Sequence, residues 1–326
     1  MPFPGESKNR QVAFLRGHEL YLFGGNRSTG QHDFGPDDFT REGWVLNLAT
    51  FKWSGAAEYP AERQSMRGVL QAEGDHGFTV GGFGTGGRGA LEGEAGTFAE
   101  AFAYSFEGNA WNAQMFEDIP PRSQFLLAKR DGGLWIFGGQ YTDENATSEG
   151  GTVYTTEVFR SEAVAGSEKG PIRFSDAGVS LPFGRCAFAG ATLGDQVYFV
   201  GGMREDFELL EVCHRFDFET QEFSVMPSPN APRLGAKLVP LDGKLYLIGG
   251  YTRGEHDRLT PERSIEFFDP ASQTWSLHSA ALPDDNRHIH AFAYQGRLMV
   301  FTTHFEGESK ARVTLIEPDH GAGSGV

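Results

Sequence analysis

The chain is poor in cysteine, and it has no long apolar run. Only Cys186 and Cys213 occur among 326 residues, which excludes a disulfide framework and favours a reducing compartment. No apolar stretch approaches the roughly 18 residues that a membrane helix needs. The first residues, Met1-Pro-Phe-Pro-Gly-Glu-Ser-Lys, contain no apolar core of a secretory signal. We therefore expect a cytoplasmic protein without a membrane span.

Basic residues are also scarce. The sequence has 28 Lys and Arg against 44 Asp and Glu, which gives a formal net charge of −16. Nucleic acids and anionic membranes are bound through basic surfaces, so this balance argues against both partners. The chain also lacks a nucleophile elbow, a phosphate-binding loop and a paired-cysteine metal motif.

The sequence does contain one repeated motif, a short apolar strand that ends in two glycines. Leu20-Tyr-Leu-Phe-Gly24-Gly25 is the first copy, and four more follow. A sixth copy, Leu298-Met-Val-Phe-Thr302-Thr303, keeps the strand and loses the glycines. The second glycine position falls at residues 25, 82, 139, 202, 250 and 303. A period near 50 residues indicates serial repetition of one supersecondary unit.

Each copy carries further elements in a constant order. An arginine stands 15 to 19 residues before the second glycine position, and an aromatic residue follows late in most units. Turns rich in Gly and Asp separate the apolar stretches, as in tight β-hairpins. The arginines are Arg10, Arg63, Arg122, Arg185, Arg233 and Arg287, and the aromatics are Trp53, Trp111, Phe174, Phe223 and Trp275. We expect four antiparallel strands per unit, with a polar loop after each glycine pair.

The arginine, the strand with its glycine pair and the late aromatic together resemble the Kelch repeat. The resemblance covers residues 10 to about 319. It implies an all-β fold, a six-bladed β-propeller formed by a single domain of residues 1–319, with a flexible tail at residues 320–326. The glycine pair would allow close backbone approach near the propeller axis, and the late aromatic would pack between neighbouring blades.

The repeat places the arginines and the loops after the glycines on the same rim. The residues there include Phe83, Gln140, Tyr251 and His304. Six arginines around a central mouth could bind a protein or acidic peptide, or a small anion, through bidentate hydrogen bonds. The same arginines could instead pair with acidic residues or cap backbone carbonyls between blades. Both interpretations stay open.

Catalytic and metal-binding alternatives have weaker support. His288 and His290 point to the same side of one strand, and His304 follows in the same blade, so three imidazoles could hold a transition metal. Isolated histidine pairs in strands are far commoner than metal sites, and we expect no metal and no cofactor. The neighbours His32-Asp33 and His256-Asp257 are poor candidates for acid–base work, because adjacent loop residues usually point apart. Kelch copper-radical oxidases need a cross-linked cysteine and tyrosine, and the accompanying set is not evident here.

We therefore predict a non-catalytic binding module whose loop-rich face holds a protein or peptide. The resemblance leaves two alternatives. One is an enzyme or binding protein for an acidic sugar or another small anion, as in the six-bladed sialate mutarotases. The other is an accessory protein for peptide biosynthesis. Fold alone does not choose among them.

The two ends of the chain predict how the last blade is built. Val313-Thr-Leu-Ile-Glu-Pro318 aligns with a third strand, and no aromatic fourth strand follows it or precedes Arg10. Blade six should therefore have three strands and an open edge, where a partner or a second copy could add a strand. Cys186 and Cys213 align with the first and third strands of blade four, too far apart for a disulfide, so both should be free thiols.

Overall fold

The computed structural model describes residues 1–28, 34–71, 74–89, 95–113, 116–162, 172–205, 208–254, 258–283, 288–304 and 309–319. It divides into two compact units. Unit one comprises Met1–Ala187 with Phe305–Ser309, and unit two comprises Phe188–His304 with Lys310–Val326. The described residues form β-strands joined by turns, with no α-helix among them and two short 3-10 turns, η1 (Pro36–Asp38) and η2 (Glu149–Gly151). Among these residues, no helix is long and apolar enough to cross a membrane.

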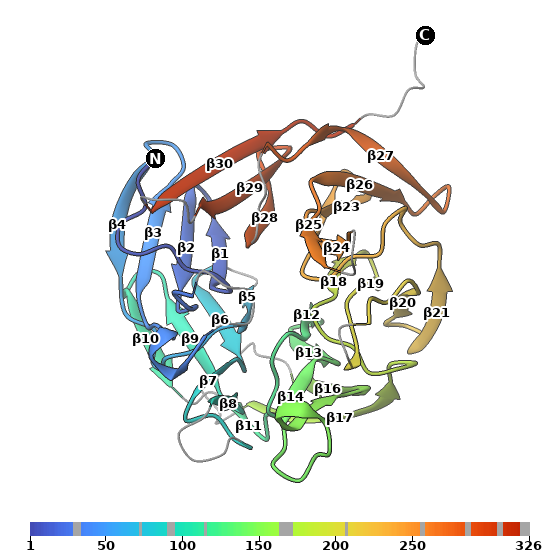
Figure 1. Cartoon of the computed structure of the whole chain (residues 1–326), viewed down its shortest axis with the longest axis horizontal. Coiled ribbons are helices and arrows are strands. Elements are labelled where there is room, and N and C mark those ends of the chain that lie inside the picture. The colour runs from blue at the N-terminus through green and yellow to red at the C-terminus, as the bar shows by residue number, and fades with distance from the viewer. Residues whose placement is uncertain are drawn as a thin grey trace. The chain divides into compact units, whose positions relative to one another are not determined.

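The described residues of unit one form three sheets of four or five strands, coloured blue to green in Figure 1. The first consists of β1 (Val12–Arg16), β2 (Glu19–Phe23), β3 (Gly43–Asn47) and β4 (Lys52–Ala56). The second consists of β5 (Arg67–Leu70), β6 (His76–Val80), β9 (Ala101–Ser105) and β10 (Ala110–Ala113). The third consists of β12 (Leu126–Arg130), β13 (Gly133–Phe137), β16 (Glu157–Ser161) and β17 (Ile172–Ser180). A short strand, β11 (Phe116–Glu117), joins the third sheet parallel to β17, which the repeat pattern did not predict.

The described residues of unit two form three more sheets of three or four strands. The fourth consists of β18 (Ala189–Leu193), β19 (Gln196–Val200), β20 (Cys213–Asp217) and β21 (Glu222–Met226). The fifth consists of β22 (Lys237–Leu241), β23 (Lys244–Ile248), β26 (Ser264–Asp269) and β27 (Thr274–Ala281). The sixth consists of β28 (Ile289–Tyr294), β29 (Arg297–His304) and β30 (Lys310–Ile316). These sheets are the six predicted blades, and the last has three strands, so the fold class is confirmed as an all-β six-bladed β-propeller.

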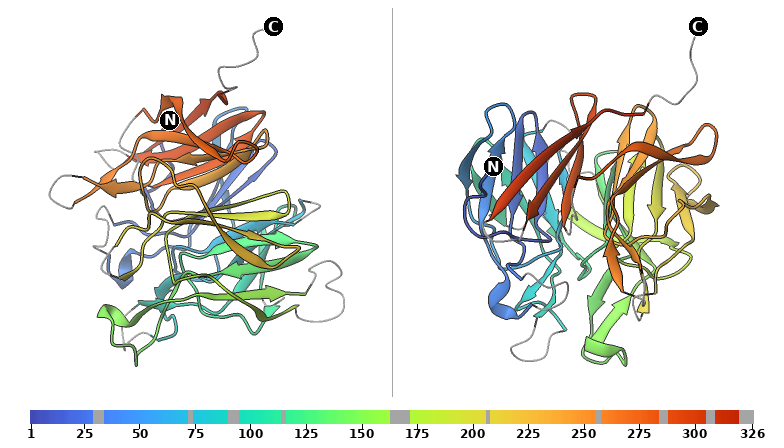
Figure 2. Two further views of the ribbon diagram at one scale, coloured as in Figure 1. Left: turned by 90° about the vertical axis from the view of Figure 1, so that its right-hand side faces the viewer. Right: turned by 45° about the horizontal axis from the view of Figure 1, so that its top comes forward.

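The segments after three of the glycine pairs are more ordered than the polar loops we expected. Each forms a two-stranded ribbon, namely β7 (Phe83–Thr85) with β8 (Ala95–Thr97), β14 (Gln140–Thr142) with β15 (Thr152–Tyr154), and β24 (Tyr251–Arg253) with β25 (Leu259–Pro261). Threonine, valine and tyrosine favour extended backbone in these segments. In Figure 2 the green ribbon β14–β15 projects beyond the long strands of blade three.

The glycine pairs have the role that the sequence predicted. Gly81 has φ +68°, and a Cβ atom there would lie 2.3 Å from the backbone carbonyl oxygen of Arg122. The next residue, Gly82, donates its N–H to that same carbonyl at 2.8 Å. The pair therefore lets the chain turn and touch the linker of the following blade, which no residue with a side chain could do at this spacing.

Blade six shows what happens without the glycines. Thr302 and Thr303 are buried, and β29 continues through them to His304. They pair with Arg312 and Ala311 of β30. Because β-branched threonine favours extended backbone, the strand does not turn at this point. Among the described residues β30 pairs with β29 alone, which leaves its outer edge without a strand.

The cores lie between neighbouring sheets, and the late aromatics Trp111, Phe174 and Trp275 pack in or against clusters that join two blades, as predicted. Phe223 contacts Phe199 and Phe216 of its own blade, and Trp53 contacts Phe3. The Trp111 ring of blade two lies 4.8 Å from Phe23 of blade one and 4.7 Å from Tyr59. Phe174 of blade three packs in one cluster with Phe78 of blade two. Each such aromatic buries a large apolar area and stabilises the pair of blades by a few kcal/mol, on the order of 3.

Both cysteines are buried free thiols, as predicted. Cys213 opens β20, the third strand of blade four. Cys186 is not in a strand, which corrects our expectation, because β18 begins three residues later at Ala189. It lies in the linker that leads into blade four, at the end of unit one.

Candidate functional site

Two of the repeat arginines in unit one are buried against carboxylates. Arg63 Nη2 contacts Glu100 Oε2 at 2.6 Å, and its Nη1 donates to the Gly81 carbonyl at 3.1 Å. Arg122 Nη2 pairs with Glu157 in the same manner, and the arginine side chain is 1% exposed. Each arginine thus ties its linker to the third strand of its blade.

Arg233 of unit two makes the most enclosed of these pairs. Its side chain is 0% exposed and that of its partner Glu266 is 1% exposed. Arg233 Nη1 also donates to the carbonyls of Gly249 at 3.3 Å and Ser264 at 3.1 Å. Burial lowers the pKa of Arg233, and the Glu266 carboxylate opposes that shift. Since this guanidinium is enclosed by protein groups, the geometry favours the structural role that the sequence left open for it.

In blade one the repeat cation is Lys8, not Arg10. Lys8 Nζ lies 2.5 Å from Glu42 Oε2 and donates to the Glu6 carbonyl at 3.0 Å. Lys8 stands 17 residues before Gly25, the same separation as Arg122 from Gly139, whereas Arg10 stands 15 before it. The repeat position that we assigned to Arg10 is therefore wrong by two residues. The short separation between Arg10 and Gly25 was the signal in the sequence that could have revealed this error.

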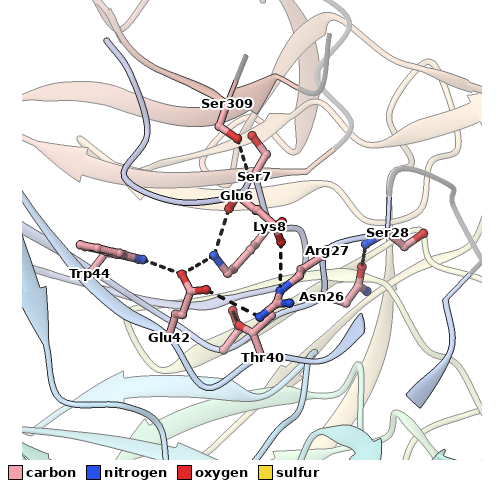
Figure 3. Close-up of polar contacts among 11 residues, drawn as sticks. Glu6, Ser7, Lys8, Asn26, Arg27, Ser28, Thr40, Glu42, Trp44 and Ser309 are labelled. Atoms are coloured by element: carbon pink, nitrogen blue, oxygen red, sulfur yellow. Dashed lines mark hydrogen bonds and ion pairs between the residues drawn. The ribbon is translucent and has the colours of Figure 1, made fainter. Parts of the chain in front are cut away.

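The surroundings of Lys8 form a polar cluster that anchors the first residues of the chain (Figure 3). Glu42 also accepts from Trp44 Nε1 at 3.0 Å and lies 3.8 Å from Arg27 Nη2. The Ser7 amide donates to Ser309 Oγ at 2.9 Å. Burial lowers the pKa of Lys8, while the hydrogen bond to Glu42 acts in the opposite direction. The cluster encloses its lysine as the other blades enclose their arginines.

Arg10 lies at a different repeat position, where the backbone is left-handed. Its φ is +54°, and Ser65, Gln124 and Ala187 have φ values of +57°, +53° and +51° at the equivalent places. The Arg10 carbonyl accepts the Ser65 amide at 2.9 Å, and the Arg10 guanidinium lies 5.4 Å from the centre of the Phe34 ring. Arg10 is half-buried and so remains within reach of a ligand.

The remaining two arginines are less informative. Arg185 is fully buried, with its guanidinium carbon 4.5 Å from the centre of the Phe183 ring. Arg287 lies outside the described residues. Whether any repeat arginine binds a ligand stays a prediction.

The residues after the glycine pairs lie beside the repeat cations, blade by blade. The backbones of Phe83, Gln140 and Tyr251 pair with Gln64, Ser123 and Leu234, which directly follow Arg63, Arg122 and Arg233. Phe83 and Gln140 are half-buried, and Tyr251 is buried with its ring 6.4 Å from that of His288. His304 ends β29, and only its backbone is described. Within each of these blades, the repeat arginine and the residue after the glycine pair therefore lie at the same end of the sheet.

Arg67 is a residue that our sequence reasoning missed. It opens β5, its side chain is half-buried, and its Nε donates to the Phe125 carbonyl at 2.6 Å. Val12 and Leu126 occupy the matching places in β1 and β12, each opposite the residue before the glycine pair. The same place holds Ala189 in blade four, Lys237 in blade five and His290 in blade six, so the repeat pattern alone did not single out Arg67.

The candidate metal and acid–base sites receive no support from the described residues. In that part of the chain, no three His, Cys, Asp or Glu side chains come together as a metal site. His288 and His290 lie at the start of blade six, and the side chain of His304 is not described. Both His-Asp neighbours, His32-Asp33 and His256-Asp257, lie outside the described residues.

Known proteins similar to parts of this chain contain Kelch repeats. A family model described as the Kelch motif matches residues 232–277. Kelch repeat and BTB domain-containing protein 13 of Homo sapiens is 39% identical over 111 residues, which are 34% of this chain and 23% of that protein. A putative F-box/kelch-repeat protein of Arabidopsis thaliana is 28% identical over 157 residues, 48% of this chain and 41% of that protein. The chain thus matches less than half the length of these curated relatives.

A solved structure shows the same fold over the whole chain. The structure of YjhT aligns with a TM-score of 0.75 at 13% identity, covering 98% of this chain and 97% of that one. Fold, repeat geometry and blade-to-blade packing together define a repeat protein of the β-propeller class. Residues 232–277 match the Kelch motif, and the relatives that match other parts of the chain are named as Kelch-repeat proteins.

Proposed function

We propose that this chain is a non-catalytic binding module that holds a protein or peptide partner on the loops of unit one. These loops comprise residues 34–39, 83–89, 95–97 and 140–154, which we call the loop platform. The observation that carries the proposal is that segments from three different blades are bonded directly to one another. The Kelch repeats of the relatives, whose names join them to a BTB domain or an F-box, support a role in protein binding.

The bonds between blades two and three are reciprocal. The Thr97 amide donates to Thr142 Oγ1 at 2.9 Å, and the Thr142 amide donates to Thr97 Oγ1 at 3.1 Å. Thr142 Oγ1 donates in turn to the Arg88 carbonyl at 2.7 Å. The ribbons β7–β8 and β14–β15 are therefore held as one body.

Blade one is bonded to the same body. Thr85 Oγ1 donates to the Pro36 carbonyl at 3.1 Å. Phe34, Phe39 and Phe83 form an edge-to-face cluster with ring centroids 5.6 to 6.2 Å apart. Loops that are already ordered lose less conformational entropy when a partner binds, so this face is preorganised for recognition.

The test is a comparison of two double charge reversals. Asp37 and Glu144 are exposed on the loop platform, while Glu107 and Glu162 are exposed at the opposite end of their blades. Partners captured on the immobilised chain from its own cells would be purified and their dissociation constants measured. We expect Asp37→Arg with Glu144→Arg to weaken binding about tenfold or more. Glu107→Arg with Glu162→Arg should leave it within about twofold.

Hydrogen exchange of the purified complex gives a second readout. Binding should slow exchange in residues 83–89 and 140–154. A partner whose affinity follows the control pair, or whose protection lies at the opposite ends of the blades, would refute the loop platform as its site. The two free cysteines support the further proposal of a reducing, cytoplasmic location.

A further inference from the structure

The loop platform carries negative charge that the described protein does not neutralise. Its charged residues are Asp37, Asp38, Asp143, Glu144 and Glu149 against Arg88. Asp37 and Glu144 are exposed, and Asp38 and Asp143 are half-buried. Among the described residues, none of these last four carboxylates has a lysine or arginine within ion-pair distance. In the corresponding loop of blade four, by contrast, Glu208 pairs with Arg204 at 2.7 Å.

The repeat cations of unit one do not offset this charge. Lys8, Arg63 and Arg122 are buried, and each pairs with a glutamate of its own blade. Their charges are therefore balanced inside the sheets. Arg10 lies beside the platform, with its guanidinium 5.4 Å from the centre of the Phe34 ring. Even when Arg10 is counted with Arg88, the acidic residues of the platform outnumber the basic ones by five to two.

The acidic residues form two pairs on either side of the ribbon of blade two. Thr85 Oγ1 donates to the carbonyl of Pro36, which precedes Asp37-Asp38, at 3.1 Å. Thr142, which precedes Asp143-Glu144, donates through Oγ1 to the Arg88 carbonyl at 2.7 Å. Thr85 and Arg88 are only three residues apart, so these two contacts lie at most about 11 Å apart along the chain. An extended segment of about five to seven residues can therefore reach both acidic pairs.

We propose that the partner on the loop platform presents an extended basic segment, with two groups of arginine or lysine residues separated by about three residues. This inference rests on the loop platform being the binding face. It takes a basic partner in place of the acidic peptide that the six arginines suggested. Exposed carboxylates attract cationic side chains and accelerate association. Phe34 and Phe83 are half-buried on the platform and add aromatic surface on which a guanidinium can lie.

Calorimetric titration of the full chain would test this chemistry with a matched pair of peptides. The probe is acetyl-Arg-Arg-Gly-Gly-Gly-Arg-Arg-amide, and its counterpart has citrulline, which keeps the shape and removes the charge, at all four arginines. We expect the wild type to bind the arginine peptide at least about tenfold more tightly. Raising the salt from about 50 mM to about 300 mM should weaken this binding, because the carboxylates are near the surface.

Two double variants remove equal charge from different places. Asp37→Asn with Glu144→Gln should weaken binding of the arginine peptide about fivefold or more. Glu107→Gln with Glu162→Gln, at the opposite end of the blades, should change it less than about twofold. Neither Asp37 nor Glu144 has a side-chain hydrogen bond to the described residues, so both platform substitutions should leave the fold intact, which circular dichroism would check.

Two results would overturn the basic partner. One is equal binding of the arginine and citrulline peptides by the wild type at up to about 1 mM probe. The other is an equal loss in the two double variants, because it would report only net charge. A captured partner that protects residues 83–89 and 140–154 from exchange, yet binds Asp37→Asn with Glu144→Gln as tightly as the wild type, rejects the basic segment and keeps the loop platform. A partner that protects the opposite ends of the blades rejects the loop platform itself.

Discussion

Removing Glu266 should destabilise the protein far more than removing its counterpart in blade two. Glu266 is 1% exposed and pairs with the fully buried Arg233. It also accepts the Asn230 amide at 2.7 Å and Asn230 Nδ2 at 2.8 Å. Glu100 pairs with the equally buried Arg63, but its own side chain is 54% exposed. Each glutamate pairs with the repeat arginine of its blade, although Glu266 lies two residues further along the third strand than Glu100 does. The two positions therefore compare such a pair at two degrees of glutamate burial.

The expected magnitudes follow from what each substitution leaves behind. Glu266→Ala leaves the Arg233 charge enclosed and two Asn230 donors without an acceptor, so the free energy of unfolding should fall by about 3–5 kcal/mol. Water can reach the side of Arg63 that Glu100 vacates, so Glu100→Ala should cost only about 1 kcal/mol.

Urea unfolding followed by tryptophan fluorescence and circular dichroism would measure both variants, provided the two probes give coincident transitions. A double variant, Arg233→Met with Glu266→Leu, serves as the control because it removes both charges. It should be more stable than Glu266→Ala, since no buried charge is left alone. The reasoning fails if Glu266→Ala loses no more stability than Glu100→Ala at unchanged m-values.

Three further results are expected. Gly81→Ala should destabilise the protein more than Gly138→Ala in urea unfolding, because the added Cβ would lie 2.3 Å from its nearest neighbour, a backbone oxygen, at Gly81 and 3.3 Å from its nearest neighbours at Gly138; equal losses would contradict this. At Gln124, with φ +53°, the glycine variant should be about 1 kcal/mol more stable than the alanine variant; an equally stable alanine variant would refute the strain. Ellman's reagent at pH 8 should label Cys186 and Cys213 only slowly in the native protein, because both thiols are buried and burial raises the pKa of Cys186. In guanidinium the same reagent should count two thiols, and fast labelling of the native protein would contradict their burial.

The repeat period predicted the fold because each part of the repeat has a local physical cause. A strand that ends in Gly-Gly must turn, and the aromatic of the fourth strand must bury its ring. The same logic predicted three strands in blade six, where the chain offers no fourth aromatic strand. The ribbons after the glycine pairs were not predictable in this way, because their strands are only three residues long and carry no clear alternation.

The ion pairs of the repeat cations were harder to predict. The glutamate partner lies on the third strand or just before it, and its separation along the sequence from the cation differs in every blade. Arg63 and Glu100 are 37 residues apart, whereas Arg122 and Glu157 are 35 apart. A spacing rule based on arginine alone also passed over Lys8, which fills the same place in blade one. Contact across such distances depends on the packed sheet, which one-dimensional spacing does not encode.

Residues that recur in several blades give evidence about folding, whereas residues found in only some blades give evidence about binding. A cation buried against a glutamate beside a glycine pair recurs in blades one, two, three and five, so folding alone explains why it is present. A binding site needs something that the neighbouring blades do not need. Arg67 stands where blades one and three have Val12 and Leu126, and Phe34 extends an aromatic cluster onto one loop. These residues are not shared by the three blades, and they lie on the same blades as the bonded loops. The search for a ligand should therefore begin at those residues and not at the repeat arginines.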